Sequence, residues 1–124
     1  MPLIPKGDED FLAEKGFNYE LVQAGTEVHL ILNNWPFPIS YMPRSASILV
    51  RILPGYPLTP IDMFYTVPDV RLAGNGAWPQ AAEQHEAHGG RTWQRWSRHI
   101  NWRSGVDTIR SFIAAITVEI NKGI

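Results

Sequence analysis

The hydrophobic pattern of the first half of the chain predicts an antiparallel meander of four strands. Between residues 27 and 33 every second residue is apolar, from Val28 to Leu32, which indicates a strand with one buried face. The run 47–53 is apolar on both faces, as expected of a central strand that a helix covers on one side. Residues 19–24 and 61–66 carry weaker strand patterns and complete the set.

The pattern at the two ends of the chain predicts helices. Residues 8–15 begin with acidic side chains, which suit the first turn of a helix, and Gly16 would end it. A second helix is expected from Ser104, the predicted N-cap, with Asp107 three residues on as in a capping box. Its apolar stripe comprises Val106, Ile109, Phe112, Ile113, Ile116 and Ile120.

The stretch 67–103 has no clear period and is rich in Gly, Trp and His. We expect a long irregular crossover here, with one or two helical turns at 80–88. Long aperiodic segments of compact domains are commonly functional, so this crossover is a candidate functional region. The order helix, four-stranded antiparallel meander, crossover, helix predicts one α+β domain over residues 1–124. Both helices would lie on one face of the sheet.

Composition and charge narrow the function classes. The 124 residues include no cysteine and carry a formal net charge of -1. A thioester, a disulfide and a cysteine-ligated metal are therefore excluded for this chain, and no global field favours nucleic acid or a membrane. No apolar run approaches the roughly 18 residues of a membrane span. Because small secreted domains usually carry disulfides, we expect a cytoplasmic protein.

Three motifs resemble the ubiquitin-conjugating-enzyme superfamily. The segment 53–64, Leu-Pro-Gly-Tyr-Pro-Leu-Thr-Pro-Ile-Asp-Met-Phe, is similar to the loop of that fold with a Tyr-Pro dipeptide and a further proline between its third and fourth strands. Residues 93–99 (Trp-Gln-Arg-Trp-Ser-Arg-His) and 102–107 (Trp-Arg-Ser-Gly-Val-Asp) resemble its prokaryotic family E. The resemblance covers roughly residues 8–121 and implies a conjugating-enzyme-like fold.

The resemblance also implies a role in a bacterial ubiquitin-like modification system. The expected partners are a ubiquitin-like modifier, an adenylating activating enzyme and a metalloprotease-type deconjugase, with no cofactor. Several such systems are associated with antiviral defence. Partners of the parent fold dock at the N-terminal helix and at the loop that here holds Tyr56. The crossover should fold into the pocket region that holds the reactive thiol, and extra sheet there would contradict the resemblance.

The chain departs from the family pattern where the catalytic cysteine is expected. Val-Pro-Asp at 67–69 replaces the His-Pro-Asn of the eukaryotic pattern. Counting on without gaps places the cysteine position at Ala77, with Asn75 as a stand-in for the oxyanion-stabilising asparagine, whereas a longer loop places it at Ala81-Ala82. Neither position holds a thiol. The alternatives are a pseudoenzyme that binds the modifier as a scaffold, or a slower carrier that uses serine or histidine.

Three histidines of the crossover offer further chemistry. His85 and His88 would lie on one side of a helical turn, and with His99 they are the candidate ligands of zinc in a histidine-based hydrolase. We favour the other interpretation, partly exposed loop histidines and no metal, because no fourth ligand stands at a suitable spacing. His99 is also the candidate general base, but a hydrogen-bonded core position suits it better because it follows a tryptophan-rich motif.

The tryptophans and arginines of 91–103 are expected to pack rather than to bind nucleic acid. Trp93, Trp96 and Trp102 would hold the crossover on the core, since a buried indole removes up to about 250 Å² from water. The arginines between them would stack on these rings or pair with carboxylates. The candidate binding residues are Tyr56, Asp62, Trp96 and Arg98, with Asp62 paired to Arg98 or Arg95 and Tyr56 bonded to a loop backbone group.

Overall fold

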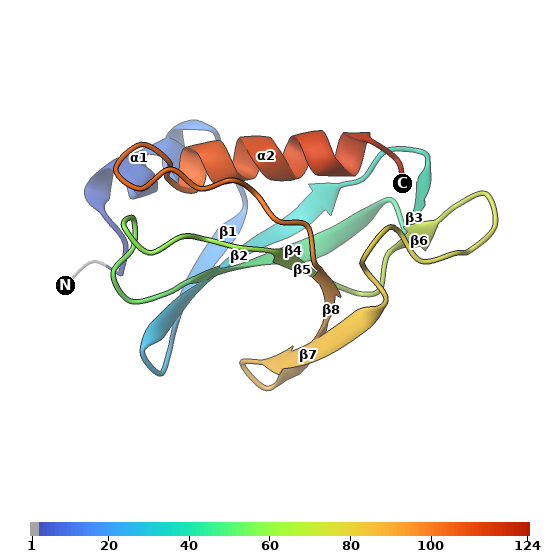
Figure 1. The fold of residues 1–124 in the computed structure, drawn as a ribbon, viewed down its shortest axis with the longest axis horizontal. Coiled ribbons are helices and arrows are strands. Elements are labelled where there is room, and N and C mark those ends of the chain that lie inside the picture. Colours follow the sequence, from blue (N-terminus) through green and yellow to red (C-terminus); the bar gives the residue numbers. More distant parts are fainter. Residues whose placement is uncertain (1–2) are drawn as a thin grey trace.

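The computed structural model describes residues 3–124 and has an α+β fold. Helices α1 (Lys6–Glu14) and α2 (Ile109–Asn121) lie on the same side of a curved antiparallel sheet, as Figure 1 shows. The fold class and the placement of both helices on one face therefore confirm the prediction. No helix in this part of the chain is long and apolar enough to cross a membrane.

The main sheet has six strands in the order β1-β2-β4-β5-β8-β7, and each neighbouring pair is antiparallel. The predicted meander is present as β1 (Tyr19–Ala24), β2 (Glu27–Pro36), β4 (Ser45–Ile52) and β5 (Phe64–Val67). A separate two-stranded ladder pairs β3 (Tyr41–Met42) with β6 (Arg71–Leu72). Since β4 lies between β2 and β5, its assignment as a central strand is confirmed.

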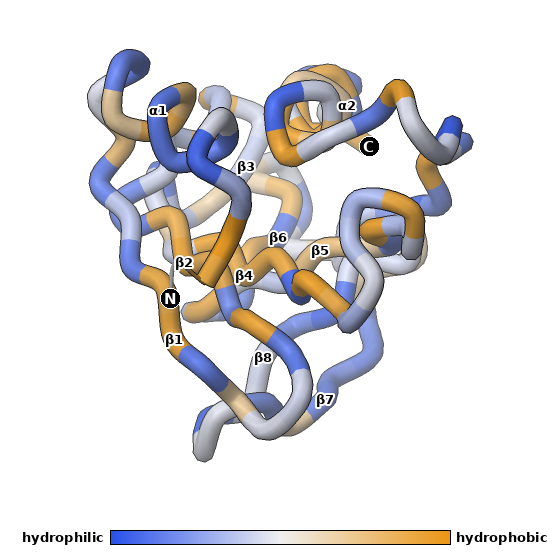
Figure 2. Tube along the Cα trace, turned by 90° about the vertical axis from the view of Figure 1, so that its left-hand side faces the viewer, coloured by the Kyte–Doolittle hydropathy of each residue, from blue (hydrophilic) through white to orange (hydrophobic). Residues whose placement is uncertain are grey.

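The prediction is wrong for the crossover between β5 and α2. This segment is not irregular, because it contains β6, β7 (Gln84–His88) and β8 (Arg91–Trp96). Strand β6 pairs with β3, whereas β7 and β8 raise the main sheet to six strands. Residues 84–88 pair with β8 instead of forming helical turns. The hydrophobic period fails here because β7 is nearly all polar and β8 buries Gln94 next to Trp93. Figure 2 shows the hydrophilic character of β7.

The side chain of Gln94 ties the crossover to the sheet. Its Oε1 accepts hydrogen bonds from Thr66 Oγ1 at 2.8 Å and from the Val70 N–H at 2.6 Å. Its Nε2 donates to the carbonyls of Val70 at 2.9 Å and Ala82 at 3.0 Å. The amide is 0% exposed and uses all of its hydrogen-bonding positions. Gln94 is thus a polar residue in the core, and each of its polar atoms has a hydrogen-bond partner.

Hydrophobic clusters cover the two faces of the sheet. The larger cluster fills the space between the sheet and the helices and joins Ile48 and Val50 of β4 to Phe112 and Ile116 of α2. Alternate residues of a strand point to opposite faces, so Leu49 belongs to a smaller cluster on the other side, with Tyr65 and Trp93. The predicted core positions of Trp93 and Trp96 are confirmed, while Trp102 is half-buried.

Helix α2 begins later than predicted. It starts at Ile109, and Thr108 precedes it with its N–H donated to Ser111 Oγ at 2.9 Å. The expected cap, Ser104, instead donates its hydroxyl to the carbonyl of Leu58 at 2.9 Å. Asp107 accepts the backbone N–H of Arg103 at 2.7 Å and shapes a turn ahead of the helix. Val106 is consequently exposed and does not join the apolar stripe.

Candidate functional site

Two loops that are distant in the sequence meet at an open groove. One precedes β5 and contributes residues 60–62, and the other follows β8 and contributes residues 99–102. The groove has a volume of about 520 Å³. Asp62 and His99 are its titratable side chains, so the chemistry of the groove depends on this pair.

The imidazole of His99 is oriented by the carboxylate of Asp62. Its Nδ1 lies 3.1 Å from Oδ1 and 3.2 Å from Oδ2, so an N–H at this position donates to both oxygens. That tautomer leaves a lone pair on Nε2, which can accept a proton from a bound group. The side chains are 75% and 47% exposed, respectively. The expectation that His99 is a core histidine is therefore wrong, and the residue is available to ligands.

Arg98 is not the partner of Asp62, which corrects the prediction for both residues. The guanidinium is buried and donates to the carbonyls of Gln80 at 3.2 Å and Glu119 at 3.0 Å, and to that of Ile124. It also lies 4.9 Å from the centroid of the Trp96 ring, so the expected stacking of arginine on indole is confirmed here. Successive residues of an extended segment point in opposite directions, and an inward Arg98 leaves His99 facing outward.

Arg95, the other partner expected for Asp62, is bound elsewhere. Its Nη1 donates to Glu86 Oε2 at 2.6 Å, and its Nε donates to Ser97 Oγ at 2.9 Å. This ion pair joins β8 to β7 and confirms the expected pairing of a crossover arginine with a carboxylate.

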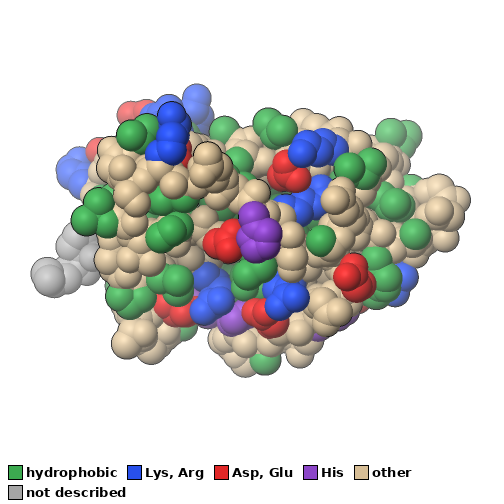
Figure 3. Space-filling view, viewed as in Figure 1, with side chains coloured by type: hydrophobic (Ala, Val, Ile, Leu, Met, Phe, Trp, Pro, Cys, Tyr) green, Lys and Arg blue, Asp and Glu red, His purple; other side chains and the backbone are tan. Residues whose placement is uncertain are grey.

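A second groove lies on the other side of His99. It has a volume of about 270 Å³ and is lined by Gln80, Ala81, Ser97, Arg98, His99, Glu119 and Lys122. Ala81 is one of the two positions expected for the missing cysteine, and its carbonyl accepts the N–H of Ser97 at 2.9 Å. Ala82, in contrast, is fully buried. Figure 3 shows a histidine next to an acidic side chain, with basic side chains nearby, on the face of the molecule that it presents.

Ala77, the other expected cysteine position, lies in the turn that follows β6. Its carbonyl accepts the N–H of Leu72 at 2.8 Å, and its own N–H donates to Asn75 Oδ1 at 3.0 Å. The amide oxygen of Asn75 is thus used within its own turn. Neither residue lines the two grooves that share His99. Ala81, at the other position expected for the cysteine, does line the second groove.

Tyr56 connects the loop between β4 and β5 to both helices. Its hydroxyl donates to Asp8 Oδ2 at 2.8 Å and accepts the N–H of Ile109 at 2.8 Å. The predicted bond to a backbone group therefore exists, although that group is the first residue of α2. Burial raises the pKa of Tyr56 well above its ordinary value, so the phenol stays protonated. Trp102 adds a hydrogen bond from Nε1 to the carbonyl of Pro57 at 3.0 Å.

The three-histidine zinc site, the less favoured interpretation of the sequence, does not form among the described residues. His85 pairs with Asp69 at 2.9 Å, His88 with Glu86 at 2.9 Å and His99 with Asp62. Because residues 84–88 form a strand, positions three apart point to opposite faces rather than to one side of a helix. The three imidazoles are therefore held by three separate carboxylates.

Sequence reasoning missed two groups of residues. Glu119 and Lys122 line the second groove and form an ion pair at 2.6 Å. The one sequence signal for this ion pair is their spacing of three residues near the end of α2. Glu27 and His29 of β2 meet His88 of β7 on the face of the sheet opposite to the helices. No local spacing connects residues 27 and 88, so this second cluster depends on the curvature of the sheet.

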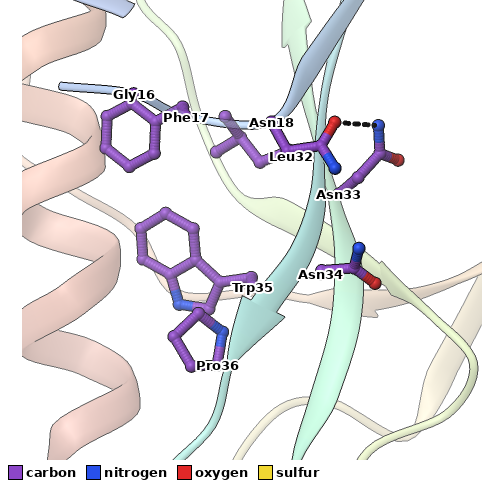
Figure 4. Close-up of a pocket in the computed structure, with 8 residues that line it drawn as sticks. All are labelled: Gly16, Phe17, Asn18, Leu32, Asn33, Asn34, Trp35 and Pro36. Carbon is purple, nitrogen blue, oxygen red and sulfur yellow. Dashed lines mark hydrogen bonds between the residues drawn. The ribbon is translucent and has the colours of Figure 1, made fainter. Parts of the chain in front are cut away.

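A further cavity, of about 340 Å³, lies between the end of α1 and the end of β2. Figure 4 shows the rings of Phe17 and Trp35 facing one another there, with centroids 5.9 Å apart. Asn33 donates its amide to Asn18 Oδ1 at 3.4 Å at the rim. The lining includes no titratable side chain.

The comparisons with known proteins identify one family. The model of prokaryotic E2 family E matches residues 4–123, which is nearly the whole chain. No curated protein and no solved structure matches the chain significantly. The family match confirms the resemblance carried by the tryptophan motifs. The expectation that extra strands in the crossover would contradict this resemblance was wrong, because β7 and β8 extend the sheet of a chain that the family model matches.

Proposed function

This chain belongs to prokaryotic E2 family E, and from that premise we propose that it acts in a bacterial ubiquitin-like modification system without forming a thioester of its own. A thioester carrier needs a thiolate, which attacks readily and also leaves readily near neutral pH. The chain has no cysteine. It therefore binds the modifier non-covalently and presents it to a partner, as a scaffold does.

The exposed pair of His99 and Asp62 between two grooves is the observation that carries the proposal. One groove is lined by Ala81, at a position expected for the cysteine, and His99 lines both. In this arrangement the end of the modifier occupies the grooves, and Nε2 of His99 accepts a hydrogen bond from a donor group of that end. Asp62 keeps the imidazole in the tautomer that leaves Nε2 as the acceptor.

The proposed partners follow from the family and from the Tyr56 contacts. An adenylating activating enzyme supplies the modifier, and a metalloprotease-type deconjugase removes it. Because Tyr56 binds Asp8 and Ile109 together, the loop after β4 and helix α1 form one continuous surface on which the activating enzyme docks. A cytoplasmic location and a role in antiviral defence belong to the same proposal.

Binding of the modifier tests the scaffold role. We expect His99→Ala to weaken binding at least about tenfold, equivalent to ~1.4 kcal/mol, and Asp62→Asn to weaken it less. His85→Ala is the matched control, because His85 also pairs with an aspartate, at 2.9 Å, but lies outside both grooves. Equal affinity of His99→Ala and the wild type for the modifier contradicts the proposed site.

Ser97 offers a second candidate function, an ester-forming carrier, because it lines the same groove as His99. A serine needs an adjacent base to attack, and its ester transfers the modifier slowly. The chain is incubated with activating enzyme, modifier and ATP, and any adduct is treated with hydroxylamine. An adduct that Ser97→Ala abolishes and Ser104→Ala retains identifies the carrier. Stable binding without an adduct identifies the scaffold.

A further inference from the structure

A polar cluster lies on the face of the sheet opposite to the helices, away from the His99 grooves. Strands β2 and β7 are not neighbours in the sheet. The sheet nevertheless curls enough to bring the rings of His29 and His88 together, with centroids 6.0 Å apart and planes at 90°. Gly89, in the turn after β7, lies against the ring of His29. The edge strand β7 therefore meets β2 at these residues.

Three metal-binding side chains converge at this point. Glu27, His29 and His88 each offer one ligand atom, and these atoms all lie within 4.8 Å of one another. His29 is only 5% exposed, and the other two are half-buried. Buried imidazoles are commonly satisfied by ordinary hydrogen bonds. Here, however, two of them and a carboxylate, from the non-adjacent strands β2 and β7, share one small space.

We propose that Glu27, His29 and His88 bind a divalent transition metal ion of the zinc class. Two histidines and one carboxylate, with water as the fourth ligand, are a donor set that zinc uses in proteins. Metal–ligand bonds of about 2.0–2.2 Å place tetrahedral ligands about 3.3 Å apart. The ligand atoms, now within 4.8 Å of one another, must approach somewhat further to reach this geometry.

Hydrogen bonds already orient the ligands for this role. His88 has its Nε2 at 2.9 Å from Glu86 Oε1, so an N–H there leaves Nδ1 as the ligand atom. Glu86 in turn accepts from Arg95 and from the hydroxyl of Tyr65, at 2.6 and 3.2 Å. Carboxylates that fix a ligating imidazole in this way are the usual outer partners of zinc-bound histidines.

Arg51 limits the affinity of the site. It donates to both carboxylate oxygens of Glu27 at 2.8 Å, so its guanidinium competes with a cation for this carboxylate. His29 must also give up its 2.7 Å contact with Glu27 Oε1. We therefore expect micromolar rather than nanomolar binding.

The bound ion would hold the β7–β8 hairpin against β2 and close the curl of the sheet. A ligand that binds only the folded chain raises its thermal midpoint. This function is independent of the proposed modifier binding, because the ligands do not line the grooves that share His99.

Zinc titration of the chelator-treated chain tests the site. We expect one zinc per chain by calorimetry and elemental analysis, together with a raised thermal midpoint. His29→Gln and His88→Gln should each weaken binding at least about tenfold. His85→Gln is the matched control, since His85 lies on the same strand as His88 but pairs with Asp69. No binding at about 100 μM zinc, or equal binding by His29→Gln, overturns the proposal.

The unmodified chain provides a measurement that does not depend on variants folding. Ring-nitrogen resonances of all four histidines are followed by NMR as zinc is added. Shifts of His29 and His88 with unchanged His85 and His99 support the site. A response confined to His85 and His99 overturns it, whatever the result of the modifier-binding assay.

Discussion

The hydroxyl of Tyr56 donates a 2.8 Å hydrogen bond to Oδ2 of Asp8, so the loop after β4 is tied to the first helix. The same oxygen accepts the N–H of Ile109, at the start of the second helix. Asp8 is largely buried, and this burial raises its pKa while the hydrogen bond from Tyr56 acts in the opposite direction. One phenol therefore determines how both helices meet the proposed docking loop.

We predict that Tyr56→Phe lowers the free energy of unfolding by about 2–3 kcal/mol, because it leaves a buried carboxylate and a backbone N–H without their partner. Urea unfolding of Tyr56→Phe, Asp8→Ala and the double variant measures the effect. The two changes should be less than additive, since they remove the same contact. Additive effects of the two substitutions would show that the hydrogen bond does not couple the loop to α1.

Gln94 gives a second stability prediction. Replacing it with leucine removes four hydrogen bonds and leaves the N–H and carbonyl of Val70 and the carbonyl of Ala82 without this partner in the core. The hydroxyl of Thr66 loses its acceptor and keeps the hydrogen bond from the N–H of Trp96. At about 1–3 kcal/mol for an unsatisfied buried group, we expect Gln94→Leu to cost at least about 3 kcal/mol in chemical denaturation.

The control for this prediction is Gln84→Leu on the neighbouring strand. Gln84 is exposed, so its replacement should change stability by no more than about 0.5 kcal/mol. If Gln94→Leu is as stable as Gln84→Leu, the buried amide network does not hold the crossover to the sheet.

The contrast between β1 and β7 shows why only part of the fold was predictable. Strand β1 (Tyr19–Ala24) was found with its observed limits, because it lies in a stretch whose neighbours alternate clearly. Strand β7 was missed because its polar side chains are satisfied by partners from other strands, such as Glu86 by Arg95. Strand β8 was missed for the same reason, because it buries the polar Gln94 at a position where an apolar residue would be expected. Hydrophobic periodicity detects strands that bury apolar groups and misses those that bury hydrogen bonds.

The candidate site was predictable as a set of residues but not as a set of pairs. His99 and Asp62 were both identified from the motifs, yet Asp62 was assigned to an arginine. Adjacent residues such as Arg98 and His99 point in opposite directions, and the sequence does not show which of them turns inward. The choice between Ala77 and Ala81 depended on a loop length that counting cannot determine.

The ion pair of Glu27 and Arg51 predicts a pH dependence of stability. The hydrogen bond from Arg51 is the largest cause that lowers the pKa of Glu27 from its ordinary value of 4.5 to about 2. As the pH falls, the Glu27 carboxylate of the unfolded chain binds a proton at a higher pH than that of the folded chain, so acidification favours unfolding. Stability from Glu27 is present above about pH 4.5 and is lost as the pH falls toward 2.

Thermal unfolding of the wild type and Glu27→Gln between about pH 6 and about pH 3 measures this contribution. We expect a shallower fall of the midpoint in Glu27→Gln. Some pH dependence remains in Glu27→Gln because the pKa of Glu86 is also lowered. Burial raises the pKa of Glu86, but the hydrogen bonds from Arg95 and His88 together lower it by more. Identical slopes in the two proteins would mean that the Glu27–Arg51 contact does not persist in solution.

Arg98 and His99 are neighbours for which we predict opposite consequences of substitution. Arg98→Met keeps an apolar stem but removes the buried donor to the carbonyls of Gln80, Glu119 and Ile124, so it should cost about 2–3 kcal/mol in urea unfolding. His99→Ala removes a side chain that is 75% exposed and should change stability by no more than about 0.5 kcal/mol. It should nevertheless reduce modifier binding. A His99→Ala variant that unfolds as readily as Arg98→Met would mean that His99 is structural, and its loss of binding could not then be assigned to the groove.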